Sequence, residues 1–248
     1  MLRVGRIPYL NCEPFFHRLT GVELTDLIPR RLGEAMAADE LDAGPLSLMD
    51  YVRLESRLVP LPYGIGCPTG ARSVLVFSDR PLPALGGARI GVTGETSTSV
   101  ELLRVLLALR HEVESVAWVG PDEPCDAQLL IGDQAIRRLT GGPAARHVFD
   151  LAIEWREWTG LPFVFARWAV AARVPTGDRR AFEAALDTAL DRGLAALPEI
   201  AAGRRDLGWT GAQVESYLRN FAFRLGPDEE KGATEFLRLR AQLGPAAC

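Results

Sequence analysis

The sequence predicts an α/β protein built as two lobes with a ligand cleft between them. Strand-like apolar runs alternate with helix-like segments through most of the 248 residues, a pattern typical of α/β folds with mostly parallel sheets. Prolines and glycines cluster at residues 79–87, which predicts a crossover between two such units. After about residue 175 only helical patterns remain. Two lobes joined by crossovers create a cleft, and clefts between domains are the usual small-molecule sites.

The first part of the chain supplies the expected first lobe. Pro29 favours a helix start, since proline is tolerated in a first helical turn, and Ser47 is a good N-cap. The apolar run at 73–78 is typical of a buried strand. The expected strands are 2–7, 22–28, 41–46 and 73–78, and the expected helices are 14–19, 30–38 and 48–54.

A second strand–helix unit follows the predicted crossover. Its expected strands are 89–92, 115–119 and 128–131, and its expected helices are 100–110 and 134–139. Gly141, Gly142 and Pro143 would end the last of these helices. The apolar strand 163–171 would then return the chain to the first lobe, followed by tail helices at 178–196, 198–205, 211–221 and 228–243. The expected lobes are therefore residues 1–80 with 168–248, and residues 81–167.

Composition excludes several classes of function. The net charge is −4 and no Lys/Arg cluster forms a basic face, which argues against nucleic-acid binding and against a DNA-binding sensor. No apolar run reaches the roughly 18 residues of a membrane span, and no secretion signal is visible. We therefore expect a cytoplasmic protein.

Metal binding is not predicted either. The four cysteines, at 12, 67, 125 and 248, include no CxxC pair, and the chain has only three histidines. A structural zinc site requires closely spaced ligand pairs. The scattered cysteines also argue against a disulfide framework and for a reducing compartment.

The loop at residues 94–99, with the sequence GETSTS, is a candidate anion site. It follows a strand and opens a helix, where free backbone N–H groups and the helix dipole favour negative charge. Thr96, Ser97, Thr98 and Ser99 add hydroxyl donors. No GxGxxG or GxxxxGK[ST] motif is present, so a carboxylate fits better than a nucleotide. The alternative is that one hydroxyl only caps the helix.

Three further candidates lie at predicted strand ends or in a cleft loop. Asn11 closes the first strand and would point into the crevice where open α/β sheets bind ligands, or it makes a local turn. Ser73 begins an apolar strand, and the alternative is a solvated strand end; no GxSxG elbow supports a nucleophile. Cys67 lies in the loop before Ser73, with nothing basic beside it to lower its pKa.

Asp133 and the tryptophans near residue 155 also have two interpretations each. Asp133 follows a buried strand as a helix N-cap, or it is a cleft carboxylate that takes a proton. Trp155 and Trp158 wall a ring-shaped substrate, or they pack the hinge between the lobes, which is the favoured interpretation.

Three segments resemble the chorismate dehydratase family, which opens the futalosine route to menaquinone. They are residues 7–11 (IPYLN), 130–135 (LIGDQA) and 155–166 (WREWTGLPFVFA), and the resemblance extends from about residue 3 to 225. It implies the two-lobed type II periplasmic-binding-protein-like fold, with a ligand cleft between the lobes.

The resemblance also implies an activity: loss of water from chorismate to give 3-[(1-carboxyvinyl)oxy]benzoate, with no cofactor. Asn11 and Ser73 match positions of functional polar residues in that family. The turn from Thr96 to Ser99 matches its carboxylate-binding helix start. We therefore expect Asn11 and Ser73 to be catalytic, and Thr96, Ser97, Thr98, Ser99, Asp133 and Cys67 to bind the substrate. Because histidine is absent from these motifs, our hypothesis is that the substrate's own side-chain carboxylate accepts the proton.

Two other functions remain open. One is a non-catalytic protein that binds small carboxylates, such as a solute receptor, but receptors of this shape need a secretion signal. The other is the related naphthoate synthase of the same pathway, whose N-terminal motif differs from residues 7–11. The sequence does not indicate an oligomeric state.

Overall fold

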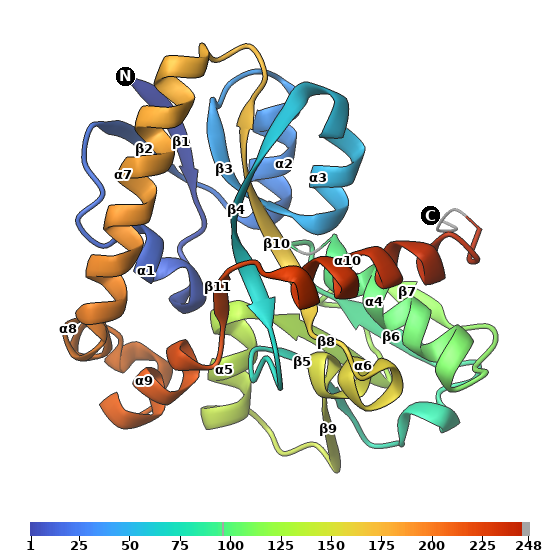
Figure 1. The fold of residues 1–248 in the computed structure, drawn as a ribbon. Helices are drawn as coiled ribbons and strands as arrows, with labels where there is room; N and C mark the ends of the chain where they lie inside the picture. Colours follow the sequence, from blue (N-terminus) through green and yellow to red (C-terminus); the bar gives the residue numbers. More distant parts are fainter. Residues whose placement is uncertain (96, 245–248) are drawn as a thin grey trace.

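The computed structural model describes residues 1–95 and 97–244, which form two β-sheets flanked by helices (Figure 1). The first sheet has the order β11-β4-β10-β3-β1-β2. Its strands are β1 (Leu2–Arg6), β2 (Val22–Asp26), β3 (Ala43–Ser47), β4 (Leu58–Cys67), β10 (Phe163–Ala171) and β11 (Ala222–Arg224). The second sheet has the order β7-β6-β8-β5-β9. Its strands are β5 (Val74–Ser78), β6 (Arg89–Val92), β7 (Ala117–Val119), β8 (Ala127–Ile131) and β9 (His147–Asp150).

Helices cover both sheets and then continue as a C-terminal tail. Those beside the first sheet are α1 (Glu13–Phe16), α2 (Pro29–Ala37), α3 (Leu48–Leu54) and α7 (Thr176–Ala195). Those beside the second are α4 (Thr98–Val105), which runs into a π-helical turn at Leu106–Arg110, α5 (Gly132–Gly141) and α6 (Leu151–Thr159). The tail continues with α8 (Leu197–Gly203), α9 (Gly211–Arg219) and α10 (Pro227–Arg240). Short 3₁₀ turns occur at Leu10–Cys12, Glu55–Arg57, Leu82–Ala84 and Arg205–Leu207.

Both sheets are mixed, whereas the sequence predicts mostly parallel ones. In the first sheet β1 pairs parallel with β2 and β3, but β10 pairs antiparallel with β3 and β4. In the second sheet β6 pairs parallel with β7 and β8, but β5 is antiparallel to β8 and β9. Strands β4, β5 and β10, which adjoin the connections between the two sheets, pair antiparallel, and so does β11 of the tail with β4.

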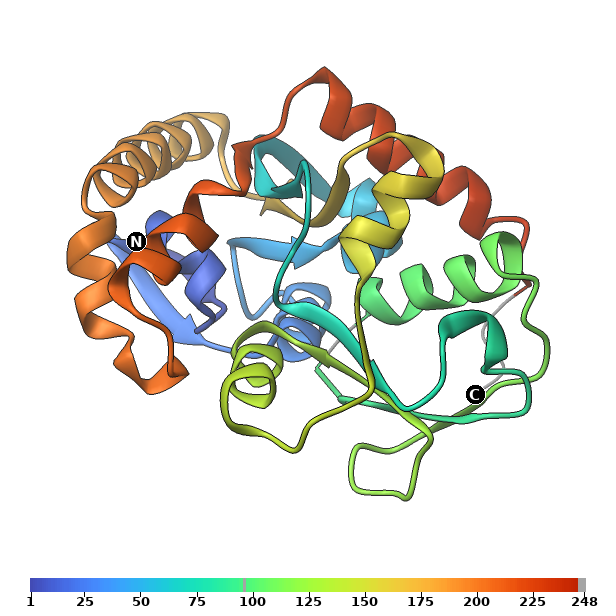
Figure 2. The ribbon, with the colours of Figure 1, turned by 90° about the horizontal axis from the view of Figure 1, so that it is seen from below.

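The chain passes between the sheets at two places. Residues 68–73 connect β4 to β5, and the return runs through α6 to β10; Figure 2 shows both connections from below. Residues 79–87, expected as a crossover, instead join β5 to β6 inside the second sheet. We propose that the lobes follow the sheets, which places β5 in the second lobe and all of β10 in the first.

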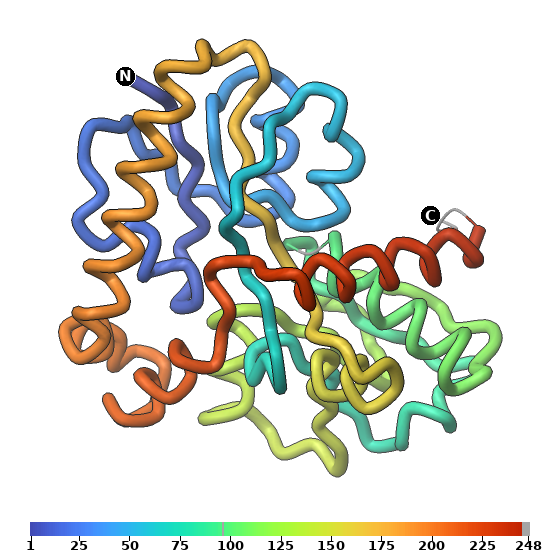
Figure 3. The backbone as a smooth tube through the Cα atoms, in the orientation of Figure 1, coloured from blue at the N-terminus to red at the C-terminus, as the bar shows by residue number. Residues whose placement is uncertain are grey.

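The tail spans both lobes. Helix α10 packs against β10 and against α4, and Figure 3 shows it lying across the junction. The approach is close at Gly232, where an added Cβ would lie 2.0 Å from the Pro162 carbonyl oxygen. Only glycine permits this contact.

Aromatic packing fills the junction between the lobes. Trp155 is fully buried, packs edge-on against Phe163 and Phe236, and donates its indole N–H to the Pro162 carbonyl at 3.2 Å. Trp158 lies edge-on to Trp155. Neither tryptophan lines the cavity described below, so the packing interpretation is the one that the structure supports.

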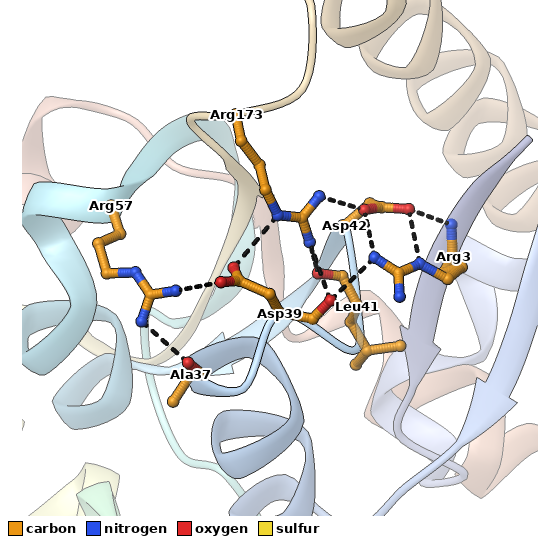
Figure 4. Close-up of polar contacts among 7 residues, drawn as sticks. All are labelled: Arg3, Ala37, Asp39, Leu41, Asp42, Arg57 and Arg173. Carbon is orange, nitrogen blue, oxygen red and sulfur yellow. Dashed lines mark hydrogen bonds and ion pairs between the residues drawn. The ribbon is translucent and has the colours of Figure 1, made fainter.

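An ionic network joins strands of the first sheet at the end away from that cavity (Figure 4). The Asp42 carboxylate accepts hydrogen bonds from the backbone N–H and guanidinium of Arg3 and pairs with Arg173 at 2.5 Å. Arg173 also pairs with Asp39, which in turn pairs with Arg57. Burial opposes ionisation of Asp42, but the two arginines outweigh it and hold its pKa well below the usual range.

Within the described residues, no helix combines the length and hydrophobicity needed to cross a bilayer.

Candidate functional site

A cavity lies between the two sheets, and its empty volume, open solvent included, is about 570 Å³. Most of its wall comes from residues where β1, β3 and β8 end and where α4 begins. The polar lining residues are Tyr9, Asn11, Cys12, Ser47, Ser73, Ser97, Thr98 and Ser99. Apolar side chains, including Ile7, Val74, Ile131, Phe165 and Phe221, complete the wall. Among the described lining residues none has a charged side chain.

Asn11 lies in the 3₁₀ turn that follows β1 and faces this cavity. Its Oδ1 atom is buried and has no hydrogen-bond partner among the described residues. A buried acceptor without a donor costs about 1–3 kcal/mol. The turn interpretation gives Oδ1 no partner, whereas a ligand hydroxyl or amine in the cavity would satisfy it.

Ser73 lies directly before β5 and is only 1% exposed. The alternative interpretation from the sequence, that Ser73 is a solvated strand end, is therefore wrong. Its hydroxyl lies 2.8 Å from the Tyr217 hydroxyl and 3.2 Å from the Ala71 carbonyl oxygen. The loop that carries Ser73 is held by Asp150, whose carboxylate accepts from the N–H groups of Ala71 and Arg72 at 3.0 and 2.6 Å. Burial raises the pKa of Asp150, against the lowering effect of these N–H donors.

The N-cap and first residues of α4 bring Ser97, Thr98 and Ser99 to the cavity, while Thr96 lies outside the described residues. Two of these hydroxyls also contact the first lobe. Ser97 donates to the Asp50 carboxylate at 3.1 Å, and Thr98 accepts from the Met49 N–H at 3.1 Å. Ser97 is the N-cap of α4, and its side chain makes no capping bond. The anion site at this helix start stays a prediction.

Asp133 is not the N-cap predicted from the sequence. The N-cap of α5 is Ile131, and Asp133 lies in the first turn. Its carboxylate accepts from the Leu10 N–H at 2.9 Å and forms an ion pair with Arg204 from the tail. Through these two partners Asp133 links the second lobe to the first lobe and to the tail. It does not line the cavity.

Two buried cysteines lie near the cavity, and only Cys67 was expected there from the sequence. Cys67 ends β4 and is fully buried, but it does not line the cavity, whereas Cys12 does. Burial raises the pKa of both thiols well above the ordinary value. Both therefore stay protonated near neutral pH and are poor nucleophiles.

Tyr9 bridges the lobes at the edge of the cavity. Its hydroxyl donates to the Glu95 carboxylate on the loop after β6, and its ring lies against Gly132. Burial and the bond to Glu95 raise the pKa of Tyr9. Gly132 has φ +56°, and an added Cβ there would lie 2.6 Å from the Tyr9 ring.

Sequence reasoning missed several of these residues. Tyr9 belongs to the 7–11 segment that was singled out, so the signal for it was present. Ser47 was predicted only as the N-cap of α3, which it is: its Oγ accepts from the Asp50 N–H at 3.1 Å. No local signal pointed to Tyr217 on α9 or to Arg204 just after α8, because both lie in the tail, far along the chain.

Comparisons with known proteins agree with this arrangement. The profile of a family described as "Menaquinone biosynthesis" matches residues 2–242. The chain is 31% identical to the chorismate dehydratase of Thermus thermophilus, over 94% of this chain and 93% of that protein. It is 25% identical to the 1,4-dihydroxy-6-naphtoate synthase of the same organism, over 99% of this chain and 96% of that one.

Among solved structures, the periplasmic aliphatic sulphonate binding protein SsuA of Escherichia coli superposes with a TM-score of 0.66. The match covers 97% of this chain and 85% of SsuA. At 14% identity it is evidence for the fold alone. The predicted α/β fold of the periplasmic-binding-protein type is thereby confirmed. Together with the profile match over nearly the whole length, these likenesses show that the chain belongs to the menaquinone-biosynthesis family.

Proposed function

We propose that this protein is a cytoplasmic chorismate dehydratase, which forms 3-[(1-carboxyvinyl)oxy]benzoate from chorismate in the futalosine route to menaquinone. The identity to the Thermus chorismate dehydratase supports this reaction. The observation that carries it is the buried, unpartnered Oδ1 of Asn11 in a cavity of neutral donors and apolar walls. Such a cavity suits a ring that carries a hydroxyl.

The reaction needs little from the protein. A ring C–H bond and the neighbouring C–OH bond break, the freed electron pair completes an aromatic ring, and water leaves. Aromatisation makes the step strongly downhill. The site must hold two carboxylates, assist departure of hydroxide and leave room for a proton acceptor.

We assign these tasks to the neutral lining residues. The Asn11 Oδ1 accepts a hydrogen bond from the ring hydroxyl and so orients the ring. Ser73 donates to the oxygen that leaves. Ser97, Thr98 and Ser99, with the N-terminus of α4, bind a carboxylate of the substrate.

The proton acceptor is the side-chain carboxylate of the substrate itself. This assignment follows from the described cavity wall, which contains no Asp, Glu or His. Asp133 is engaged by Leu10 and Arg204 outside that wall. Glu95 is engaged by Tyr9.

The test is to incubate the purified protein with chorismate and to follow the benzoate product by chromatography against a synthetic standard. We expect turnover by the wild type and a loss of roughly 100-fold or more in kcat for Asn11→Ala, the scale of positioning and charge-stabilising contacts. Ser73→Ala should lose activity on the same scale. Ser78→Ala is the matched control, because Ser78 is also buried but lies at the end of β5 that is far from Ser73.

Two outcomes would overturn the proposal. Binding of chorismate without product would indicate a carboxylate-binding protein. Formation of 1,4-dihydroxy-6-naphthoate from the corresponding precursor, with no reaction on chorismate, would indicate the synthase activity named for the second Thermus relative.

A further inference from the structure

The tail helix α9 delivers one hydroxyl to the site described above. Tyr217 is 1% exposed, and its oxygen lies 2.8 Å from the Ser73 Oγ. Its ring is held between Trp209 and Phe221, with centroids at 5.2 and 5.0 Å. A capping box at Thr210 and Gln213 fixes the start of the helix. Tyr217 does not itself line the cavity.

The direction of this hydrogen bond follows from the other partners of the two oxygens. Ser73 has a second partner, the Ala71 carbonyl at 3.2 Å, to which only its own proton can be donated. The Tyr217 hydroxyl makes no other hydrogen bond within the described residues. If Ser73 donated to Tyr217, the buried phenolic proton would have no protein acceptor, and an unsatisfied buried donor is costly. The phenol therefore donates to Ser73.

Burial raises the pKa of Tyr217 well above its ordinary value, against the lowering effect of the hydrogen bond with Ser73. The phenol thus remains protonated, and able to donate, throughout the neutral range.

We propose that Tyr217 is a positioning residue: by donating its proton to the Ser73 Oγ, it commits the Ser73 hydroxyl to act as a donor toward the cavity. The bond from Ser73 to Ala71 is long for an O–H···O contact, so a ligand oxygen can replace it. Accepting a bond from one hydroxyl also strengthens the donor character of the next. The kinetic part of this inference rests on the proposed function, in which Ser73 assists the leaving hydroxide.

The first test concerns stability and needs no substrate. Urea unfolding is measured for wild type, Ser73→Ala, Tyr217→Phe and the double variant. Ser73→Ala leaves the phenolic proton without its acceptor, whereas Tyr217→Phe leaves Ser73 still bonded to Ala71. We expect Ser73→Ala to be the less stable single variant, and we expect adding Tyr217→Phe to it to restore stability. A double variant no more stable than Ser73→Ala overturns the direction of the bond.

The second test is kinetic. We expect Tyr217→Phe to lower kcat by roughly 10- to 100-fold, on the scale of small misplacements of a reacting group, with little change in KM. In the Ser73→Ala background the same change should have no further effect. Equal losses in both backgrounds would overturn the positioning role.

Tyr63→Phe is the matched control. It removes another buried phenol, one that donates to Asp187 at 2.9 Å away from the cavity, and should leave kcat and KM unchanged. If the wild type fails to convert chorismate, the proposed function fails, while the stability comparison still decides whether Tyr217 donates to Ser73.

Discussion

At the scale of single residues, the position of Asp133 shows how one side chain can look catalytic and act as a connector. Its carboxylate is 6% exposed and is shared between the Leu10 N–H and the Arg204 guanidinium. Arg204 in turn contacts Glu13 and Asp206. A buried carboxylate with these partners holds three parts of the chain together.

The substitution Asp133→Asn separates this role from that of a base. The amide oxygen can still accept from Leu10, but the charge opposite Arg204 is lost, so we expect the free energy of unfolding to fall by about 1–3 kcal/mol. Turnover of the folded protein should stay within about tenfold of wild type, since a base would lose far more. Complete loss of turnover with chorismate still bound would make Asp133 the proton acceptor.

At the scale of elements, the site depends on how strands turn into helices. Ile131 ends β8, and Gly132 begins α5 with φ +56° beneath the Tyr9 ring. A left-handed backbone and a close approach both require glycine at this point. The junction between β8 and α5 therefore forms part of the cavity wall and packs against the Tyr9 ring.

Gly132→Ala should be strongly destabilising. The added Cβ would cost about 1 kcal/mol or more in backbone strain and would also clash with the Tyr9 ring. We therefore expect a lower melting temperature and, because both residues line the cavity, a raised KM. Gly177→Ala is the control: it lies in α7 with nothing within 4 Å of an added Cβ. There alanine should be neutral or stabilising by about 0.5–1 kcal/mol. Equal effects of the two changes would contradict this account.

The ionic network at Asp42 predicts the acid stability of the first sheet. The pKa of Asp42 is lower in the folded state than in the unfolded chain, so the unfolded chain binds more protons in acid. The contribution of Asp42 to the stability of the folded protein is complete above the unfolded pKa of about 4. This contribution is lost as the pH falls below that value.

We therefore expect the stability of the wild type to fall steeply below about pH 4 and Asp42→Asn to flatten that part of the curve. Urea unfolding at a series of pH values measures this. Asp187→Asn is the comparison, because Asp187 is 44% exposed beside Arg224 and solvent screens its pair. A pH curve that Asp42→Asn leaves as steep as wild type would contradict the assignment.

At the scale of the whole molecule, the described arrangement has the two lobes in contact around the cavity. Polar bridges run from Tyr9 to Glu95, from Leu10 to Asp133, from Met49 to Thr98 and from Asp50 to Ser97. Helix α10 also contacts both lobes, through β10 and α4. Movement of the lobes to admit a ligand would have to break these bridges.

Tyr9→Phe tests this arrangement. Removing the hydroxyl deletes the bridge to Glu95, so the closed state loses stability relative to any open one and apparent affinity falls with it. We expect a several-fold rise in KM with little change in kcat, measured with chorismate. Tyr51→Phe, on α3 and outside the cavity wall, should change neither. A fall in kcat at unchanged KM would indicate that Tyr9 acts on the chemical step.

The sequence predicts much of this molecule where the signal is local. The Ser47 cap, the strand at 163–171 and all four tail helices are confirmed. Strand β4 was missed because Pro60, Pro62, Gly64 and Gly66 hide its periodicity. The edge strand β9 and helix α6 were missed as well, and the edge strand β11 interrupts the tail that was predicted to be all helical.

What the sequence by itself determined is the fold class, the 7–11 and 94–99 segments, and the hydroxyl-rich character of the candidate site. These depend on neighbours a few residues apart, which propensity and capping govern. Only the tertiary structure decided that Asp133 meets Leu10 and that Tyr217 meets Ser73, pairs separated by 123 and 144 residues. Such contacts arise from the packing of whole elements, and no local pattern records which distant side chain a folded backbone will bring into reach.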